Sequence, residues 1–315
     1  MGAGHHHHSH GHHAGHHHGH SHAPPANAGT AFAIALTLNV TFVIAEFAAG
    51  LFSGSMALVA DAGHNLSDVL SLALAWAASV LSARPPSQRF TYGLKSSSIL
   101  AAIANAALLW VAIGAILVET LRRLPSPEAV GGTTMVIVAG IGIAVNGLSA
   151  LLFAKGARSD INLRAAFVHL MADALVSVGV VVAGLLIRWT GEALIDPVTS
   201  LIITAVIAWS SWGLLRDSLR MGMLGVPEGI DAAKVRALLE SQPGVTRVHD
   251  LHIWPMSTTE TALTAHLVMP QGQPGNSFLH RVAEQLEHDF GIAHSTLQVE
   301  FDDQGGCPLE NEAAV

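Results

Sequence analysis

Six apolar stretches, each close to the length of a membrane-spanning helix, limit the possible folds of this chain more than any other feature. About 20 helical residues cross the roughly 30 Å of hydrocarbon in a bilayer. The stretches cover residues 30–52, 57–82, 97–121, 132–154, 164–189 and 194–215. Only 12% of the 315 residues are charged, against about 25% in a typical soluble domain. We therefore predict a polytopic α-helical membrane domain with six transmembrane helices.

After Met221 the sequence becomes a mixture of polar and apolar residues, as in a soluble domain. Its patterns predict a helix over 231–241, strands over 245–254 and 259–269, a helix over 276–290 and a strand over 294–301. This α-β-β-α-β order is typical of a small α+β domain with helices on one face of a sheet. We divide the chain into a tail (1–28), a transmembrane domain (29–220), this α+β domain (226–303) and a disordered C-terminus (304–315).

Histidines dominate the N-terminal tail, which holds 12 of the 20 in the chain within its first 22 residues. An expression tag is one interpretation. The runs are interrupted by Gly, Ser and Ala and none reaches six residues, so we favour a native metal-binding tail. Such a composition cannot form a packed core, and we expect disorder without metal.

Two of the predicted spans each carry a His and an Asp four residues apart, namely His64 with Asp68 and His169 with Asp173. Residues at i and i+4 share a helical face. Two such helices packed together would direct two imidazoles and two carboxylates at one point, a donor set that suits tetrahedral zinc. An Asp at the bilayer centre costs about 2.5–3.5 kcal/mol on insertion scales, and a divalent cation would compensate for that cost.

Two further acids lie in predicted spans, and their roles stay open at this point. Asp61, three residues before His64, could accept a hydrogen bond from an imidazole or bind metal directly. Glu46 could be a hydrogen-bonding residue or a proton relay. The single cysteine, Cys307, excludes a disulfide framework and a CxxC metal site, and it is either a free thiol or a metal ligand.

Charge excludes one class of partner and predicts an orientation. The net charge of −8 and the scarcity of Lys and Arg argue against nucleic acid as a partner. Most Lys and Arg residues fall on one side if both termini are cytoplasmic, which is the orientation that the positive-inside rule favours. The HExxH motif of intramembrane zinc proteases is absent, and we do not expect an enzyme.

At the level of motifs, the chain resembles the cation diffusion facilitator family, and its zinc-type branch in particular. The resemblance rests on "ADAGHNLSDVLSLALAW", "RFTYGLKSS", "HLMADALVSVGVVVAG", "IDPVTSLII" and "VHDLHIW", and extends from Ala31 to about Asp303. It implies a homodimeric metal/proton antiporter in the lipid bilayer, with a ferredoxin/metallochaperone-like cytoplasmic domain. By motif, the family's transport ligands fall on the same four residues, His64, Asp68, His169 and Asp173.

The resemblance also implies a cytoplasmic metal site made of His249, His266, His294 and Glu300. A straight strand would point His249 and His252 to opposite faces. His294 and Glu300 would share a face but lie about 20 Å apart in an extended strand. They could bind one ion only if His294 lay in a bend before the strand or if two subunits contributed. Ordinary surface histidines are the alternative.

The resulting expectation is secondary active efflux of Zn²⁺, with Cd²⁺ and Co²⁺ also suited, in exchange for protons as the counter-substrate. Zinc would also be a regulatory ligand. We expect a bacterial inner (plasma) membrane protein with both termini in the cytoplasm. A metal-selective channel and a membrane-bound metal sensor are the alternative functions.

Overall fold

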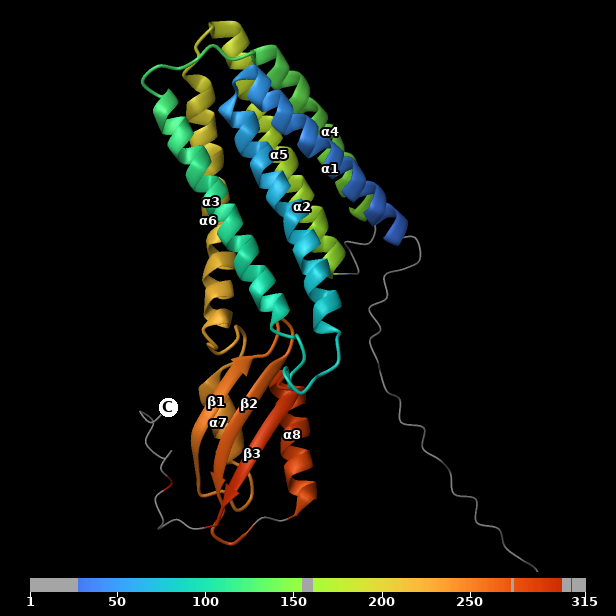
Figure 1. Cartoon of the computed structure of the whole chain (residues 1–315), viewed down its shortest axis with the longest axis vertical. Coiled ribbons are helices and arrows are strands. Elements are labelled where there is room, and N and C mark those ends of the chain that lie inside the picture. Colours follow the sequence, from blue (N-terminus) through green and yellow to red (C-terminus); the bar gives the residue numbers. More distant parts are fainter. Residues whose placement is uncertain (1–27, 155–160, 273–274, 302–306, 308–315) are drawn as a thin grey trace, which may run out of the picture.

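The computed structural model describes residues 28–154, 161–272, 275–301 and Cys307. A bundle of six long helices and a small α+β domain are stacked end to end (Figure 1). The helices are α1 (Ala28–Ser53), α2 (Met56–Ser82), α3 (Ser97–Arg123), α4 (Gly132–Ala154), α5 (Ile161–Thr190) and α6 (Ile195–Gly222). Five of them are long and apolar enough to cross a membrane, and α1 adds the shorter apolar helix Thr37–Ser53. The predicted helical domain is thus confirmed, whereas the histidine-rich tail and most of the C-terminus lie outside the described residues.

Within the bundle, α4 packs along α5, α3 packs along α6, and α1 lies against α2 and α4. Close packing of α4 on α5 depends on a pair of glycines. A Cβ at Gly132 would lie 2.8 Å from the carbonyl oxygen of Gly184, so no larger residue fits without movement. Small residues at helix contacts are typical of membrane proteins, where burial of apolar surface does not drive helices together.

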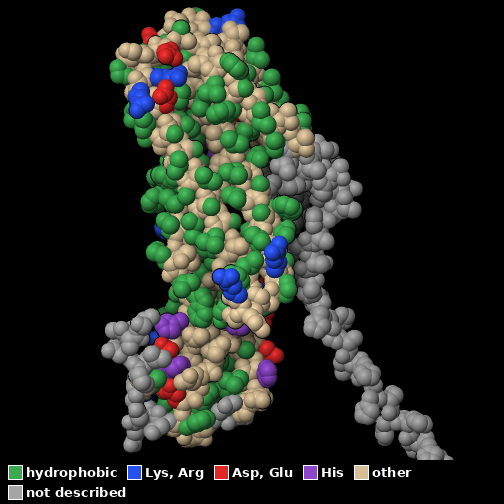
Figure 2. Space-filling view, in the orientation of Figure 1, with side chains coloured by type: hydrophobic (Ala, Val, Ile, Leu, Met, Phe, Trp, Pro, Cys, Tyr) green, Lys and Arg blue, Asp and Glu red, His purple; other side chains and the backbone are tan. Residues whose placement is uncertain are grey.

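The outer surface of the bundle is apolar. Hydrophobic side chains cover its middle on the face shown in Figure 2, while Lys, Arg, Asp and Glu gather at its far end and towards the α+β domain. Large exposed side chains include Trp76, Val111, Trp189 and Trp209. An apolar surface of this extent is unsuited to water and suits lipid. The chain is therefore a multi-pass membrane protein.

The C-terminal domain contains α7 (Ala232–Glu240), β1 (Arg247–Pro255), β2 (Thr261–Val268), α8 (Asn276–Phe290) and β3 (His294–Glu300). The strand order is β1-β2-β3, with β1 antiparallel and β3 parallel to β2. Apolar side chains from both helices and from one face of the sheet form a core that includes Val235, Leu239, Leu263, Leu267 and Phe278. The predicted α-β-β-α-β order is confirmed. Both helices pack on one face of the sheet, and the opposite face carries His249 and His266.

The prediction that His249 and His252 point to opposite faces is wrong. His249 pairs with His266 and His252 pairs with Thr264, so β1 uses one more residue than β2 between the two pairs. Asp250 lies in this bulge with a φ of 50°, a left-handed conformation that is uncommon for residues other than glycine. Because the bulge reverses the alternation of side chains, both histidines lie on the same face.

Candidate metal sites

The first candidate site lies between α2 and α5, where one helical turn separates His from Asp on each helix. The Nε2 atom of His64 is 3.8 Å from Oδ2 of Asp68 on its own helix and 3.5 Å from Oδ1 of Asp173 on α5. The Nε2 atom of His169 is 3.3 Å from Oδ2 of Asp68 and 3.6 Å from Oδ2 of Asp173. Each imidazole therefore faces both carboxylates, and the four side chains identified from helical spacing lie together.

The four residues are not equivalent. Ligand atoms of His64, Asp68 and Asp173 all lie within 4.8 Å of one another, a set that could hold one metal ion. His169 approaches the same carboxylates with a side chain that is 48% exposed, whereas that of Asp173 is 5% exposed. The two imidazole rings are 6.1 Å apart between centroids. Two nitrogens and two carboxylate oxygens match the ligands that zinc takes in tetrahedral sites.

Asp61 and Glu46 lie beside this group but do not join it. Asp61 Oδ2 accepts a hydrogen bond of 3.0 Å from Ser177 Oγ, and Glu46 Oε2 accepts one of 3.4 Å from Asn65 Nδ2. His64 Nδ1 is buried and has no hydrogen-bond partner among the described residues. Asp61 therefore does not orient the imidazole of His64 in this structure.

A cavity of about 450 Å³ approaches this site from the side of the C-terminal domain. It is lined by α2, by α3 and by the hairpin between β1 and β2, with Ser71 and Asn105 among its lining residues. Ser71 donates a 2.7 Å hydrogen bond to Asn105 Oδ1, and it lies one helical turn beyond Asp68. The cavity is mainly apolar with hydroxyl groups along its length, and its described lining ends at Ser71 without including Asp68.

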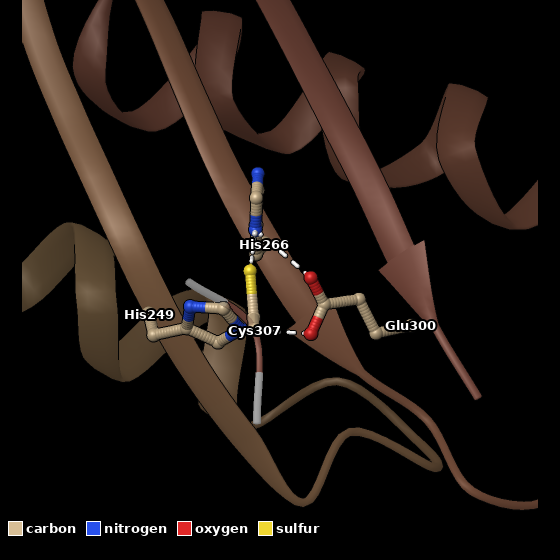
Figure 3. Close-up of side chains that lie close together, drawn as sticks. All are labelled: His249, His266, Glu300 and Cys307. Carbon is tan, nitrogen blue, oxygen red and sulfur yellow. Dashed lines mark hydrogen bonds and ion pairs between the residues drawn. The ribbon is translucent and has the colours of Figure 1, made fainter. Parts of the chain in front are cut away.

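The second candidate site lies on the open face of the C-terminal sheet (Figure 3). His249 Nε2 is 2.9 Å from Oε2 of Glu300, and His266 Nδ1 is 3.0 Å from Oε1 of the same carboxylate. The Cys307 sulfur lies 3.8 Å from His266 Nδ1, and all four residues offer ligand atoms within 4.8 Å of one another. His249 Nδ1 is buried without a partner in the described residues. Two imidazoles, a carboxylate and a thiol fit zinc.

The structure does not bring His294 into this group. His294 opens β3 and pairs with Ala262, whereas Glu300 pairs with Val268 at the other end of the strand. The bend that would bring His294 back to Glu300 is absent, because His294 already belongs to the strand. Its ring instead contacts Tyr92 of the α2–α3 connection, with centroids 5.6 Å apart. Inclusion of His294 in one site with Glu300 is therefore wrong within this chain.

Asp250 was missed by the sequence analysis. Its Oδ1 is 2.9 Å from His252 Nε2 and its Oδ2 is 3.4 Å from His266 Nε2. The motif "VHDLHIW" contains this acid, but the motif does not predict the bulge that turns the acid towards the histidines.

Glu300 has the charge that metal binding requires. Burial raises the pKa of its carboxyl, but hydrogen bonds from His249 and Cys307 outweigh that effect, so the pKa lies below its ordinary value. The group is therefore ionised at neutral pH and can act as a ligand.

Comparisons with known proteins cover nearly the whole chain. The family model described as the cation efflux transmembrane domain matches residues 32–221, and the model described as the cytoplasmic domain of cation efflux proteins matches residues 227–302. The chain is 37% identical over 302 residues to the metal cation efflux system protein CzcD of Cupriavidus metallidurans, covering 96% of this chain and 91% of that protein. It is 34% identical over 280 residues to the zinc transporter ZitB of Escherichia coli, covering 88% of this chain and 89% of that protein.

A cadmium, cobalt and zinc/H(+)-K(+) antiporter of Bacillus subtilis is 34% identical over 272 residues, covering 85% of this chain and 87% of that protein. The solved metal-bound C-terminal domain of the CzcD transporter from Cupriavidus metallidurans is 35% identical, with a TM-score of 0.21, and covers 22% of this chain and 99% of that one.

Proposed function

This chain belongs to the cation efflux, or cation diffusion facilitator, family of metal transporters, and we propose that it exports zinc-type divalent ions in exchange for protons. The transport site in this proposal is His64, Asp68, His169 and Asp173. One observation carries it, namely that both imidazoles face both carboxylates between two membrane-spanning helices. Buried charges in a membrane require a partner, and a dication suits two carboxylates.

The donor set favours borderline metals. Imidazole and carboxylate together suit Zn²⁺, and also Cd²⁺ and Co²⁺, whereas Mg²⁺ and Ca²⁺ prefer shells of oxygen. The relatives named for zinc, cadmium and cobalt support this choice of substrates.

Protons compete with the metal at such a site, because an ion binds neutral imidazole and ionised carboxylate. An inward-facing site would load metal and lose protons to the cytoplasm. An outward-facing site would release metal and take up protons. The proton gradient could then drive metal out against its own gradient, with no covalent chemistry.

The C-terminal domain, in this proposal, regulates transport and holds two copies of the chain together. Residues 226–303 would bind a regulatory metal through His249, His266 and Glu300, with Cys307 as a fourth donor. Residues 29–220 would form the transport domain. We place both termini in the cytoplasm and the bundle in a bacterial inner membrane, following the distribution of Lys and Arg.

The test is metal uptake into proteoliposomes that contain a pH dye. We expect zinc entry coupled to proton movement in the opposite direction. Asp68→Ala and Asp173→Ala should abolish uptake while the protein stays folded, because each change removes one of the two carboxylates. His280→Ala, at an exposed position on α8, is the matched control and should transport normally. Near-normal uptake by either Asp variant would refute the site.

The same assay separates the alternatives. A metal-selective channel would give flux that persists without a pH gradient and does not move protons. A membrane-bound sensor would give no flux at all, and it would not need His and Asp pairs within the bilayer.

A further inference from the structure

A pair of acids, Glu46 on α1 and Asp61 on α2, lies fully buried beside the proposed transport site. Both residues are 0% exposed. Their carboxyl groups are close enough to hydrogen-bond to each other. Each has one oxygen, Glu46 Oε1 and Asp61 Oδ1, that is buried without a donor among the described residues. Two carboxylates cannot hydrogen-bond to each other unless one of them carries a proton.

No Lys or Arg of the described residues is among the groups that act on this pair. Glu46 is the only titratable residue of α1, and α4, which packs on α1, has none. The nearest titratable groups on α2 and α5 are His64 and Asp173. The charged residues of α3 and α6, which pack on α2, lie at helix ends, at Glu119, Arg122, Arg123, Asp196, Arg216, Asp217 and Arg220.

Two adjacent carboxylates in such a place cannot both be ionised without a large cost, because each is desolvated and each repels the other. One shared proton removes the repulsion and gives both unpartnered oxygens a hydrogen bond. Carboxyl pairs that share a proton in this way are well known in enzymes. The remaining oxygens already have donors, since Ser177 donates to Asp61 and Asn65 donates to Glu46.

We propose that Glu46 and Asp61 hold a proton that leaves when metal binds at the transport site and returns when metal departs. This inference rests on the proposed function. The hydrogen-bond partners of the pair are Ser177, Asn65 and each other, so neither acid is a metal ligand in this arrangement. The coupling is electrostatic, because a dication a short distance away strongly favours the ionised pair in a medium of low dielectric constant.

The proton of the pair is accounted for at each step. As one Zn²⁺ enters the inward-facing site, the O–H bond of the pair breaks and its proton passes to the cytoplasmic side. The pair is then doubly ionised, opposite the dication. When the metal leaves outwards, a proton from the outer side restores the O–H bond. The pair therefore supplies one proton of the exchange, separate from those of the imidazoles.

The experiment counts protons released per zinc bound. Calorimetric titration of the full-length protein in buffers of different ionisation enthalpy, at one neutral pH, gives this number. The same titration of Asp68→Ala, which lacks the transport site, is subtracted to remove zinc bound by the tail and by the C-terminal domain. We expect Glu46→Gln and Asp61→Asn to bind zinc but to release about one proton fewer than the parent, because an amide has no acidic proton. Glu119→Gln, an acid of α3 paired with Arg123, is the matched control and should release the parental number.

The outcomes separate this inference from the function on which it rests. If the parent and Asp68→Ala do not differ in zinc bound or protons released, the proposed transport site itself fails. If the parent releases protons and both folded variants release the same number, only the role of the acid pair fails. Loss of zinc binding in a folded variant would also overturn it, because the acid would then support the metal directly. Each variant tests the pair independently, so one that folds is sufficient.

Discussion

His64 and His169 are the residues that should decide which metals the transport site prefers. Replacement of His64 by Asp would give a shell with three carboxylates and one imidazole. Such a shell is harder, and zinc should lose affinity relative to manganese. Competition between Zn²⁺ and Mn²⁺ for uptake into proteoliposomes measures the change, with His280→Asp on α8 as the control. An unchanged metal ranking would mean that His64 does not touch the metal.

At the residue scale, local periodicity was sufficient to select the four intramembrane side chains. His64 with Asp68, and His169 with Asp173, are one helical turn apart, so the sequence alone placed each pair on one face. The contacts of Asp61 could not be obtained in this way. Its donor, Ser177, is 116 residues away on α5, and only the packing of the helices determines which of several buried hydroxyls it meets.

Among the elements, α2 begins in an unusual way that depends on α6. Asp196 accepts hydrogen bonds from Ser55 Oγ at 2.6 Å, from Met56 N at 2.7 Å and from Ala57 N at 3.2 Å. It therefore caps a helix to which it does not belong, at the end of the bundle away from the C-terminal domain. Asp196→Ala would leave these donors without an acceptor in a buried place, which costs about 1–3 kcal/mol for each such group.

We therefore expect Asp196→Ala to lower the thermal unfolding temperature in detergent. Tryptophan fluorescence or a thermal shift of the monodisperse fraction measures this change. Glu192→Ala provides the comparison, since it removes an exposed acid just before α6 and should leave the unfolding temperature nearly unchanged. Equal unfolding temperatures for the two variants would show that the cap contributes little.

The strands of the C-terminal domain show the limit of pattern-based prediction at this scale. Their order and approximate bounds followed from alternating polarity and turn residues. The bulge in β1 did not, because it needs a residue in the left-handed conformation, and Asp250, with a φ of 50°, is a much weaker signal for one than a glycine. That single irregularity puts His252 on the same face as His249 and His266. At His294 the prediction failed for the opposite reason. The predicted site required a bend that brings His294 close to Glu300, but β3 is regular and keeps the two residues at opposite ends.

At the scale of the whole molecule, metal bound to the C-terminal domain should favour one arrangement of the two subunits, which is a population shift. The combined change His249→Ala and His266→Ala removes two of the four donors. It should weaken zinc-induced compaction of the dimer and lower the transport rate only partly. A distance label on each C-terminal domain follows the compaction, and His280→Ala with His288→Ala removes two exposed histidines as a control. Compaction at the parental zinc concentration would place the regulatory site elsewhere.

The two parts of the chain touch at residues 95–98, around the start of α3, and any regulation by the C-terminal domain would have to act through such a contact. Ser96 Oγ donates to the carbonyl oxygen of Met256 at 3.3 Å, and the Thr258 amide donates to Ser98 Oγ at 3.1 Å. Lys95 forms an ion pair with Glu260. The β1–β2 hairpin thus lies against the connection between α2 and α3, beside the cavity that Lys95 and Glu260 help to line.

The ion pair between Lys95 and Glu260 can be tested by charge reversal. Glu260→Lys would place two like charges together at a partly exposed position, a cost of about 1 kcal/mol. That cost corresponds to a roughly fivefold fall in the equilibrium constant for contact between the β1–β2 hairpin and the α2–α3 connection. Transport in proteoliposomes should fall, whereas the global unfolding temperature should hardly change because surface ion pairs add little stability. The double reversal Lys95→Glu with Glu260→Lys restores opposite charges and should recover most of the rate. Lys234→Glu, on the exposed side of α7, should have no effect. If the double reversal transports no better than Glu260→Lys alone, the ion pair does not couple the C-terminal domain to the helices.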